Sequence, residues 1–381
     1  MRRRLRLGMV GGGQGAFIGG VHRMAARIDD RFKLVAGAFS SDAHRAKASA
    51  ADLRIDPDRA YVDFADMAVR EATRTDGIDV VAIVTPNHLH HAPAVAFLRA
   101  GINVICDKPL CHTLADAKDL AREAEASRAL FAITYNYTGY PLIRHARALI
   151  EAGELGAIRV VQVEYAQDWL STRLEDSGQK QASWRTDPGR SGVGGCIGDI
   201  GTHAANLAEF VTRLRIESLA ADLSSFVPGR RVDDNAQLML RFSEGARGGL
   251  WASQVAVGNE NALRLRVHGE KAGLEWAQEQ PNVLRVTRLG EPPLLITRGG
   301  PGTYPQAARA TRIPAGHPEG YLEAFAQLYA DFADQIESHG DGTQPDPACL
   351  LVPGIEAGLR GMRFIDAAVA SSRADGAWKT L

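Results

Sequence analysis

Cysteine is scarce in this 381-residue sequence, which contains only Cys106, Cys111, Cys196 and Cys349. These four residues form no C-x-x-C pair and show no ligand spacing typical of a zinc site. We therefore interpret them as buried, reduced thiols, and we expect no metal centre.

Long apolar runs and an excess of charge are also lacking. No stretch reaches the roughly 20 apolar residues that a transmembrane helix needs. Lysine and arginine (44) nearly balance aspartate and glutamate (45), and the net charge of −1 gives no basis for binding nucleic acid or an anionic membrane. The arginines among the first six residues are followed by glycines rather than by the apolar segment of a signal peptide. We expect a cytoplasmic protein that binds neither nucleic acid nor membrane.

The most informative stretch is the glycine-rich opening, residues 5–22. A short apolar run ends at Val10, clustered glycines follow, and the next segment is compatible with a helix. A strand, a tight turn and a helix N-terminus in this order place backbone N–H groups and the positive end of a helix dipole where a pyrophosphate can bind. Gly11, Gly13 and Ala16 fit the dinucleotide motif G-x-G-x-x-G/A, but Gly13, Gly15 and Gly19 could share its role, so two registers stay open. The candidate cofactor-binding residues of this turn are Gly11, Gly13, Gln14, Gly15, Ala16, Phe17 and Ile18.

The second predicted strand, Phe32–Phe39, ends where a dinucleotide-binding fold contacts the adenine ribose. A carboxylate there would accept a hydrogen bond from the ribose 2′-hydroxyl and would repel a 2′-phosphate. Ser40 stands at that position, and Asp42 follows two residues later. We take Ser40, Ser41 and Arg45 as candidate cofactor contacts, although Arg45 could instead face solvent from a helix. The choice between NAD and NADP stays open on these residues.

Apolar runs alternate with segments of helical period up to residue 135. The further expected strands are Asp79–Thr85, Asn103–Cys106 and Ala129–Thr134, and the helices include Ala92–Arg99 and Leu114–Ser127. Uninterrupted apolar runs indicate strands buried on both faces, and the alternation predicts right-handed crossovers. We predict an α/β fold with a doubly wound parallel sheet, whose ligands bind at the carboxyl ends of the strands. The residues at those ends include Thr85, Pro86, Asn87, His90, Asp107, Lys108, Tyr135 and Asn136.

Lys108 is the residue of this set with the clearest chemistry. A lysine beside a buried strand end can place a positive charge on a substrate oxygen or, if it is desolvated, donate a proton. A surface ion pair with Asp107 explains its position equally well.

The pattern changes after residue 135, which divides the chain into two predicted domains, residues 1–135 and 136–381. Segments that alternate with period two indicate strands buried on one face, so we expect a large, mainly antiparallel sheet with one open side. Its polar face predicts self-association into a homo-oligomer, a dimer or a tetramer. The predicted strands are Arg159–Tyr165, Ala236–Phe242, Gly249–Ser253, Leu263–His268, Leu274–Trp276 and Val283–Arg288. Gly269–Gly273 is a predicted hairpin connection, Pro281–Gly316 a predicted loop and Pro318–Ser338 a predicted helix.

The chemical segment of this second half is Ser191–His203, in which several glycines precede Asp199 and His203. If a helix begins near Asp199, the four-residue spacing places both side chains on one face. Histidine can take and return a proton as an alcohol and a carbonyl interconvert, while the carboxylate fixes its tautomer or binds a substrate hydroxyl. An isolated pair of this kind is more often a helix cap and a structural histidine. No third residue completes a metal site.

Taken together, these stretches resemble the Gfo/Idh/MocA family, the relatives of glucose–fructose oxidoreductase and inositol dehydrogenase. The specific motifs are TPNHLHH (Thr85–His91), DKPL (Asp107–Leu110) and GGCIGDIGTH (Gly194–His203), in this order. The resemblance covers almost the whole chain. It implies an N-terminal Rossmann domain, a C-terminal α/β domain with a large open sheet, and a nicotinamide cofactor, NAD with NADP not excluded. It also implies a sugar, inositol or related polyol as the substrate.

The resemblance further implies roles for individual residues. Lys108 matches the lysine of the family's EKP motif, which contacts substrate and cofactor, and Asp107 stands where the family has glutamate. Asp199 and His203 match the substrate-binding acid and the catalytic acid/base. The residues implied to line the cofactor are Thr85, Pro86, Asn87, His90, Asp107, Lys108, Trp184 and Arg185. The candidate substrate contacts are Lys108, Tyr135, Asn136, Gln167, Asp199, His203 and His317.

We therefore predict an NAD(P)-dependent dehydrogenase that oxidises a secondary hydroxyl of a cyclic sugar, inositol or related polyol. His203 would remove the hydroxyl proton, Lys108 would stabilise the developing alkoxide, and Asp199 would hold a neighbouring hydroxyl. Two alternatives stay open: a glycosidase of the same fold that uses NAD transiently, and a catalytically silent nucleotide-binding sensor. A sensor needs no proton relay, so the presence of all three residues favours an enzyme.

Overall fold

The computed structural model describes residues 3–381; Met1 and Arg2, which belong to the predicted first domain, lie outside the described residues. The chain divides into two compact units. The first contains the chain up to Asn136 together with Leu322–Leu359, and the second contains Tyr137–Tyr321 together with Arg360–Leu381. The first division lies one residue from the predicted boundary, whereas a segment near the C-terminus belongs to the first unit.

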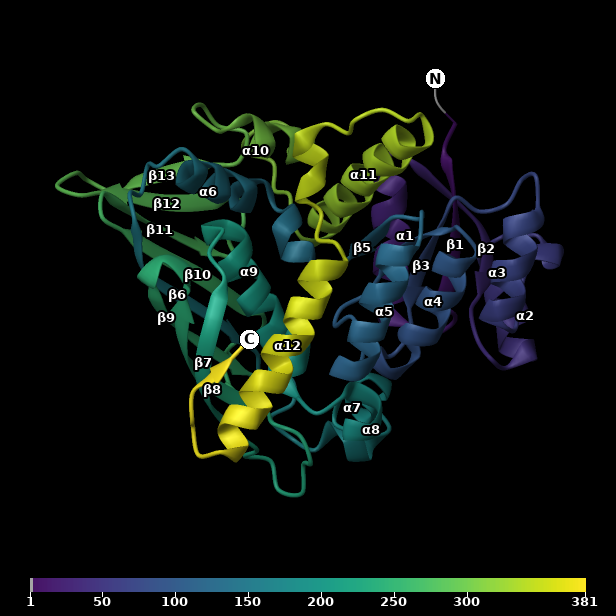
Figure 1. The fold of residues 1–381 in the computed structure, drawn as a ribbon, viewed down its shortest axis with the longest axis horizontal. Coiled ribbons are helices and arrows are strands. Elements are labelled where there is room, and N and C mark those ends of the chain that lie inside the picture. Colours follow the sequence, from purple (N-terminus) through teal and green to yellow (C-terminus); the bar gives the residue numbers. More distant parts are fainter. Residues whose placement is uncertain (1–2) are drawn as a thin grey trace. The chain divides into compact units, whose positions relative to one another are not determined.

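The first unit is built on a five-stranded parallel sheet in the order β2-β1-β3-β4-β5 (Figure 1). This order confirms the predicted doubly wound sheet and places the topological switch point between β1 and β3, where such sheets bind ligands. All residues of β3 are buried, as expected for a strand covered on both faces. The strands are β1 (Leu5–Gly11), β2 (Phe32–Ala38), β3 (Val80–Val84), β4 (Asn103–Cys106) and β5 (Phe131–Ile133). The helices are α1 (Phe17–Ile28), α2 (Ala43–Asp52), α3 (Phe64–Thr73), α4 (His91–Arg99) and α5 (Leu114–Ala126).

Helix α11 (Tyr321–Gly340) packs on the first unit around a buried histidine. His22 of α1 is fully buried, and its Nδ1 lies 2.8 Å from the hydroxyl of Tyr329 on α11. The rings of His22 and Phe325 lie edge to face, 5.1 Å apart between centroids. Arg31 adds ion pairs to Asp334 and Glu337 of the same helix. These contacts explain why residues so distant in the sequence belong to one unit.

We expect His22 to make the stability of the protein depend on pH. Burial lowers its pKa from 6.5 to about 4, with Asp107 opposing the shift. Between these values the unfolded chain binds a proton that the folded protein does not, so the stabilising contribution of neutral His22 is complete above pH 6.5 and is lost as the pH falls. The loss amounts to roughly 3 kcal/mol. Urea unfolding at about pH 4 and about pH 7 should show a weaker pH dependence for His22→Asn than for the wild type. Exposed His339 provides the control, and equal slopes for His22→Asn and His339→Asn would contradict the prediction.

The second unit is built on a nine-stranded sheet in the order β13-β12-β11-β10-β6-β9-β8-β7-β14. Strands β6 and β9 pair in parallel and their neighbours pair antiparallel, which confirms a mainly antiparallel sheet. The antiparallel pairing of β10 with β11 confirms the hairpin predicted at Gly269–Gly273. The strands are β6 (Ile158–Ala166), β7 (Ile216–Ser224), β8 (Asn235–Phe242), β9 (Arg247–Ser253), β10 (Ala262–Gly269), β11 (Ala272–Ala277), β12 (Val283–Arg288), β13 (Leu294–Thr297) and β14 (Lys379–Thr380).

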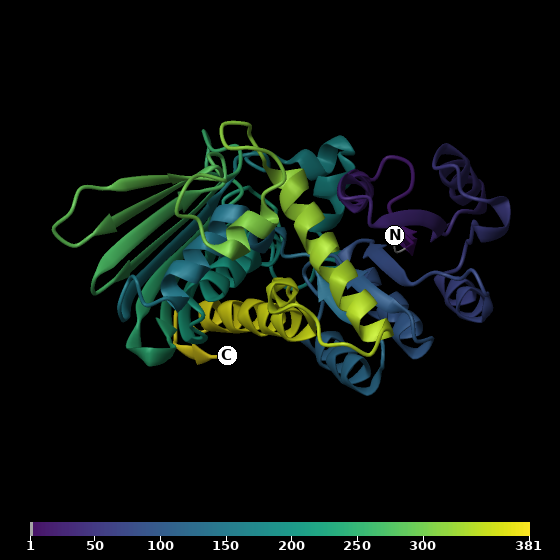
Figure 2. The same cartoon turned by 90° about the horizontal axis from the view of Figure 1, so that it is seen from above.

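Helix α9 packs against β6, β9 and β10, and α6 packs against β12, so helices cover one face of this sheet (Figure 2). Along β8 the side chains of Leu238 and Leu240 are buried on that face, whereas Gln237, Met239 and Arg241 point to the open face and are exposed. The alternation read from the sequence therefore corresponds to one covered and one open face. The helices are α6 (Pro141–Glu151), α7 (Lys180–Arg185), α8 (Pro188–Ser191), α9 (Thr202–Thr212), α10 (Pro305–Ala310) and, from Arg360 onward, α12 (Ile355–Arg373).

Two parts of this unit differ from the sequence prediction. Strand β12 matches the predicted strand Val283–Arg288, but the rest of Pro281–Gly316, predicted as a loop, contains the edge strand β13 and helix α10. Strand β7 was not predicted. The residues of β13 are mostly exposed on both faces, so the strand carries no alternating apolar pattern that could have revealed it. Among residues 3–381, no helix is long and apolar enough to cross a membrane.

Candidate functional site

The turn between β1 and α1 is shaped by a contact that only glycine allows. A Cβ atom on Gly19 would lie 2.4 Å from the Cα atom of Gly12, so α1 packs directly on the backbone of the turn. Helix α1 begins after Ala16, whose methyl group cannot cap the first N–H groups. A glycine cradle followed by such a helix N-terminus fits the pyrophosphate of a dinucleotide. The close contact between Gly19 and Gly12 involves a glycine of the second predicted register, Gly13-Gly15-Gly19.

Among the other described residues of this turn, Gln14 is held by hydrogen bonds to α2, whereas Gly15 and Phe17 are not. The N–H of Gln14 donates to Ser49 Oγ at 3.1 Å, and its side-chain amide donates to Asp52 at 2.7 Å, so Gln14 is tied to α2. Gly15 has a positive φ of 73°, and Phe17 is 65% exposed. Backbone groups of the turn, together with exposed Phe17, remain the candidate cofactor contacts here.

At the end of β2, the carboxylate of Asp42 serves as a helix cap. It accepts a hydrogen bond from the N–H of Arg45 at 2.7 Å, at the start of α2. Ser40 Oγ in turn accepts from the N–H of Asp42 at 3.2 Å. Ser40, Ser41 and Arg45 therefore stay candidate ribose contacts, while Asp42 stabilises the helix that follows them.

His90 joins the carboxyl ends of β3 and β4. Its Nε2 lies 2.8 Å from the carbonyl oxygen of Thr85, and its Nδ1 lies 2.9 Å from that of Pro109. The ring is almost fully buried, and burial lowers its pKa although Asp107 opposes the shift. Asp107 accepts hydrogen bonds from the Lys108 N–H at 2.9 Å and from the Thr134 hydroxyl at 2.8 Å. These bonds fix the turn that carries Lys108, whose peptide bond to Pro109 is cis.

Three further predicted contacts of the first unit are buried at strand ends. Asn87 follows β3 and is 7% exposed, while Tyr135 and Asn136, which follow β5, are 1% and 2% exposed. Pro86 precedes the short 3₁₀ turn Asn87–Leu89. The structure thus brings these residues to the same end of the sheet as Lys108.

The Asp199 segment of the second unit begins with a π-helical turn, Ile197–Gly201, which continues into α9. π-Helical turns occur frequently at functional sites. Asp199 Oδ2 accepts hydrogen bonds from Arg185 Nε at 3.1 Å and from Gln254 Nε2 at 2.9 Å. The Arg185 guanidinium lies over the Trp184 ring at 4.3 Å. Trp184 and Arg185, predicted as cofactor contacts, therefore support Asp199, and sequence spacing gave no indication of this ion pair.

His203 lies on a platform of tyrosines that sequence reasoning missed. Its ring is 4.9 Å from that of Tyr137 and 6.3 Å from that of Tyr165, in edge-to-face arrangements. The two tyrosine hydroxyls are hydrogen-bonded to each other, and Tyr165 donates to Asn261 Oδ1 at 2.7 Å. Burial raises the pKa of both tyrosines, so they remain neutral near pH 7. The alternation of β6 predicts that Tyr165 points inward, but no sequence signal links it to His203.

The last two predicted substrate contacts are placed differently. Gln167 donates to Asn261 Oδ1 at 2.7 Å and so belongs to the network beside His203. His317 lies in an exposed loop, and its carbonyl oxygen accepts a hydrogen bond from the buried Arg298. Arg298 also pairs with Glu319 at 3.0 Å, which holds this loop in place.

Most of the predicted site residues therefore form two sets, one in each unit. The first unit has the glycine turn and Lys108 at the carboxyl end of a parallel sheet; the second has Asp199 and His203 among hydrogen-bonding side chains. Among residues 3–381, no group of three or more His, Cys, Asp and Glu residues could hold a metal ion. Dinucleotide binding and proton transfer are the chemistry that these two sets can support.

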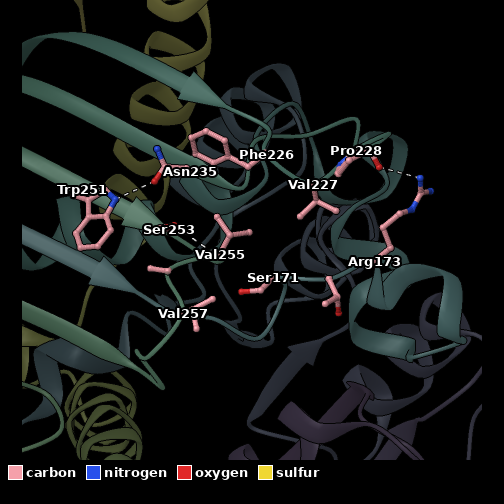
Figure 3. Close-up of a pocket in the computed structure, with 12 residues that line it drawn as sticks. Ser171, Arg173, Phe226, Val227, Pro228, Asn235, Trp251, Ser253, Val255 and Val257 are labelled. Atoms are coloured by element: carbon pink, nitrogen blue, oxygen red, sulfur yellow. Dashed lines mark hydrogen bonds between the residues drawn. The ribbon is translucent and has the colours of Figure 1, made fainter.

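A pocket of about 570 Å³ lies elsewhere in the second unit (Figure 3). Phe226, Val227 and Pro228 form one wall, and Trp251 donates to Asn235 Oδ1 at 3.0 Å on another. Its lining includes none of the predicted site residues.

Comparisons with known proteins match both halves of the chain. Residues 5–135 match the model of the oxidoreductase family with an NAD-binding Rossmann fold, and residues 143–275 match the GFO/IDH/MocA C-terminal domain. An oxidoreductase structure from Sinorhizobium meliloti is 53% identical, with a TM-score of 0.91, over 99% of this chain and 100% of that one. An inositol dehydrogenase homolog from Azotobacter vinelandii, in complex with NADH and myo-inositol, is 38% identical with a TM-score of 0.92, over 100% and 98% of the two chains. The uncharacterized oxidoreductase YfiI of Bacillus subtilis is 36% identical over 98% of this chain and 96% of its own.

We expect Gly19→Ala to weaken NADH binding while Gly20→Ala leaves it unchanged. The new methyl group at position 19 would collide with the backbone of Gly12, whereas at position 20 the nearest atom, on Arg23, is 3.9 Å away. Forcing α1 from the turn should raise the Kd for NADH about tenfold, equivalent to roughly 1.4 kcal/mol. Gly20→Ala should bind normally and gain up to about 1 kcal/mol of helix stability. Fluorescence titration with NADH and thermal unfolding measure both effects; equal affinities would contradict the prediction.

Proposed function

Because the chain belongs to the GFO/IDH/MocA family of oxidoreductases and has its NAD-binding domain, we propose that it oxidises a secondary hydroxyl of a cyclic sugar, inositol or related polyol. The myo-inositol complex of the Azotobacter vinelandii relative supports this substrate class. The observation that carries the proposal is the Asp199 carboxylate, oriented by Arg185 and Gln254 one helical turn before His203. A polyol presents several adjacent hydroxyls, which suits a carboxylate beside a proton acceptor.

His203 is the proposed acid/base. Its ring is 6% exposed and its position is restricted by Tyr137 and Tyr165, so it would accept the proton of the reacting hydroxyl from a fixed direction. Asp199 would accept a hydrogen bond from a neighbouring hydroxyl and so select which carbon reacts. Both residues would act on the alcohol and not on the nucleotide.

Lys108 is the proposed electrostatic partner of the reacting oxygen. Its main chain is held by Asp107, and Asp107 is held by Thr134, so the lysine extends from a fixed turn. Its ammonium group would stabilise negative charge on the oxygen as His203 removes the proton. The glycine turn around Gly12 and Gly19 would hold the pyrophosphate of NAD. Bound NAD supplies the hydride acceptor.

We expect His203→Ala to lower kcat by roughly 10²–10⁴-fold while NADH binding is retained, because the proposed proton acceptor is lost and the glycine turn is intact. NADH absorbance with myo-inositol and a panel of inositols and sugars measures turnover, and NADH fluorescence measures binding. His339→Ala, at an exposed position, is the matched control. Turnover by His203→Ala at the rate of His339→Ala would reject the assignment.

We also propose that the open face of the large sheet binds a second copy of the chain. Met239 on this face is 60% exposed, and Phe226 and Val257 near its end are 66% and 81% exposed. Arg264 on β10 lies 3.6 Å from Glu164 on β6, so both charges occur side by side on the face. A surface that meets its own copy across a two-fold axis needs both signs of charge, together with apolar area.

A single charge on this face should weaken the oligomer. Met239→Arg would bury a cation against its symmetry mate, whereas Val69→Arg on α3, 66% exposed, would place the same side chain on the first unit. We expect light scattering to give an oligomeric mass for the wild type and Val69→Arg, and a lower mass for Met239→Arg. A monomeric wild type would contradict the proposal.

A further inference from the structure

Two consecutive aspartates precede β8 and bind different segments of the second unit. Successive residues of an extended chain point in opposite directions. The carboxylate of Asp233 is bonded to residues 195–197, and that of Asp234 is bonded to residues 226–230. The pair therefore has one member on the segment that leads to Asp199 and one on a loop that lines the pocket of Figure 3.

Asp233 holds three successive residues. Its Oδ1 accepts a hydrogen bond from the N–H of Gly195 at 2.6 Å, and its Oδ2 accepts from the N–H of Ile197 at 2.8 Å and from the thiol of Cys196 at 3.1 Å. Its main-chain oxygen accepts from the N–H of Cys196 at 2.9 Å. A Cβ atom on Gly195 would lie 2.0 Å from that oxygen, so the approach requires glycine.

The thiol of Cys196 is a true donor in this arrangement. Cys196 is fully buried, and burial, reinforced by the charge of Asp233, raises the pKa of its thiol well above the usual value. The proton therefore stays on sulfur near pH 7, where it faces a carboxylate oxygen. The three donors together satisfy a carboxylate that is partly removed from water.

The anchored residues lead directly to the proposed catalytic groups. The carbonyl oxygen of Gly195 accepts a hydrogen bond from the N–H of Asp199 at 2.9 Å. Ile197, held by Asp233, is the first residue of the π-helical turn that carries Asp199 and continues into α9 with His203. Any shift of residues 195–197 would therefore reorient this turn.

We propose that Asp233 is a positioning residue for catalysis, which fixes the main chain of Gly195–Ile197 and thereby the orientation of Asp199 and His203. This inference rests on the proposed function and adds to it a residue that contacts neither substrate nor cofactor. It assigns no such role to Asp234, whose carboxylate accepts from the N–H groups of Phe226 and Val227 and pairs with Arg230 at 3.2 Å.

The test compares Asp233→Asn with Asp234→Asn. Asp234 is fully buried, so its loss costs stability without touching residues 195–197. We expect Asp233→Asn to lower kcat on the order of 10- to 100-fold, because a small misplacement of reacting groups has effects of that size. The KM for NAD should not change, because the glycine turn of the first unit is untouched. Asp234→Asn should keep the wild-type kcat.

A second readout does not depend on turnover. Cys196 and Cys349 are both fully buried; alkylation of Cys349 reports opening of the first unit, and Asp234→Asn controls for general destabilisation of the second. Mass spectrometry after maleimide treatment should find faster labelling of Cys196, relative to Cys349, in Asp233→Asn but not in Asp234→Asn. Equal labelling and equal kcat in the two variants would overturn the inference.

A milder substitution covers the case in which Asp233→Asn does not fold. Cys196→Ala removes the thiol donor and keeps both backbone hydrogen bonds to the Asp233 carboxylate. We therefore expect kcat to fall a few-fold with an unchanged KM for NAD. An unchanged kcat would count against the inference. The two hypotheses fail separately. If the wild type reduces no NAD with any inositol or sugar of the panel, the proposed function is rejected, and Cys196 labelling still decides whether Asp233 anchors the segment.

Discussion

The approach of Gly19 to Gly12 is the constraint on which the cofactor half of the protein depends. Because the contact joins two main-chain segments, it fixes where α1 begins relative to the end of β1. The N-terminus of α1, the end of β3 at Thr85 and the turn at Lys108 then lie at one edge of one sheet, since parallel strands all end on the same side. The His90 ring bonds the last two of these together.

In the second unit, the surrounding side chains hold the Asp199 carboxylate and the His203 ring in defined orientations. Asp199 is oriented by Arg185 from one direction and by Gln254 from another. His203 is bounded by aromatic rings whose hydroxyls are already hydrogen-bonded, so the positions of those tyrosines are set by the protein itself. In the proposed reaction, such preorganisation would lower the cost of reaching a reactive geometry.

Sequence patterns revealed those features that depend on neighbouring residues. Apolar runs located β3 and β4 within one residue, and the glycine-rich turn and the Asp199 segment followed from local motifs. Features that depend on residues far apart in the sequence could not be predicted from these patterns. The pairing of Arg185 with Asp199, the packing of Tyr329 on His22 and the anchoring of residues 195–197 by Asp233 all join segments whose spacing carries no period. Strand β13 was missed because an edge strand exposed on both faces has no alternating pattern.

The return of α11 to the first unit has a consequence for how the chain is made. Residues 322–359 complete a unit that begins at the N-terminus, so the glycine turn leaves the ribosome long before Tyr329 and Phe325 exist to cover His22. Strands β6 to β13 of the second unit are made before that point, and its last segment, Arg360–Leu381, follows after it. The nucleotide-binding end of the protein is therefore completed late in translation, and a fragment that stops at residue 135 would expose the surface that α11 normally buries.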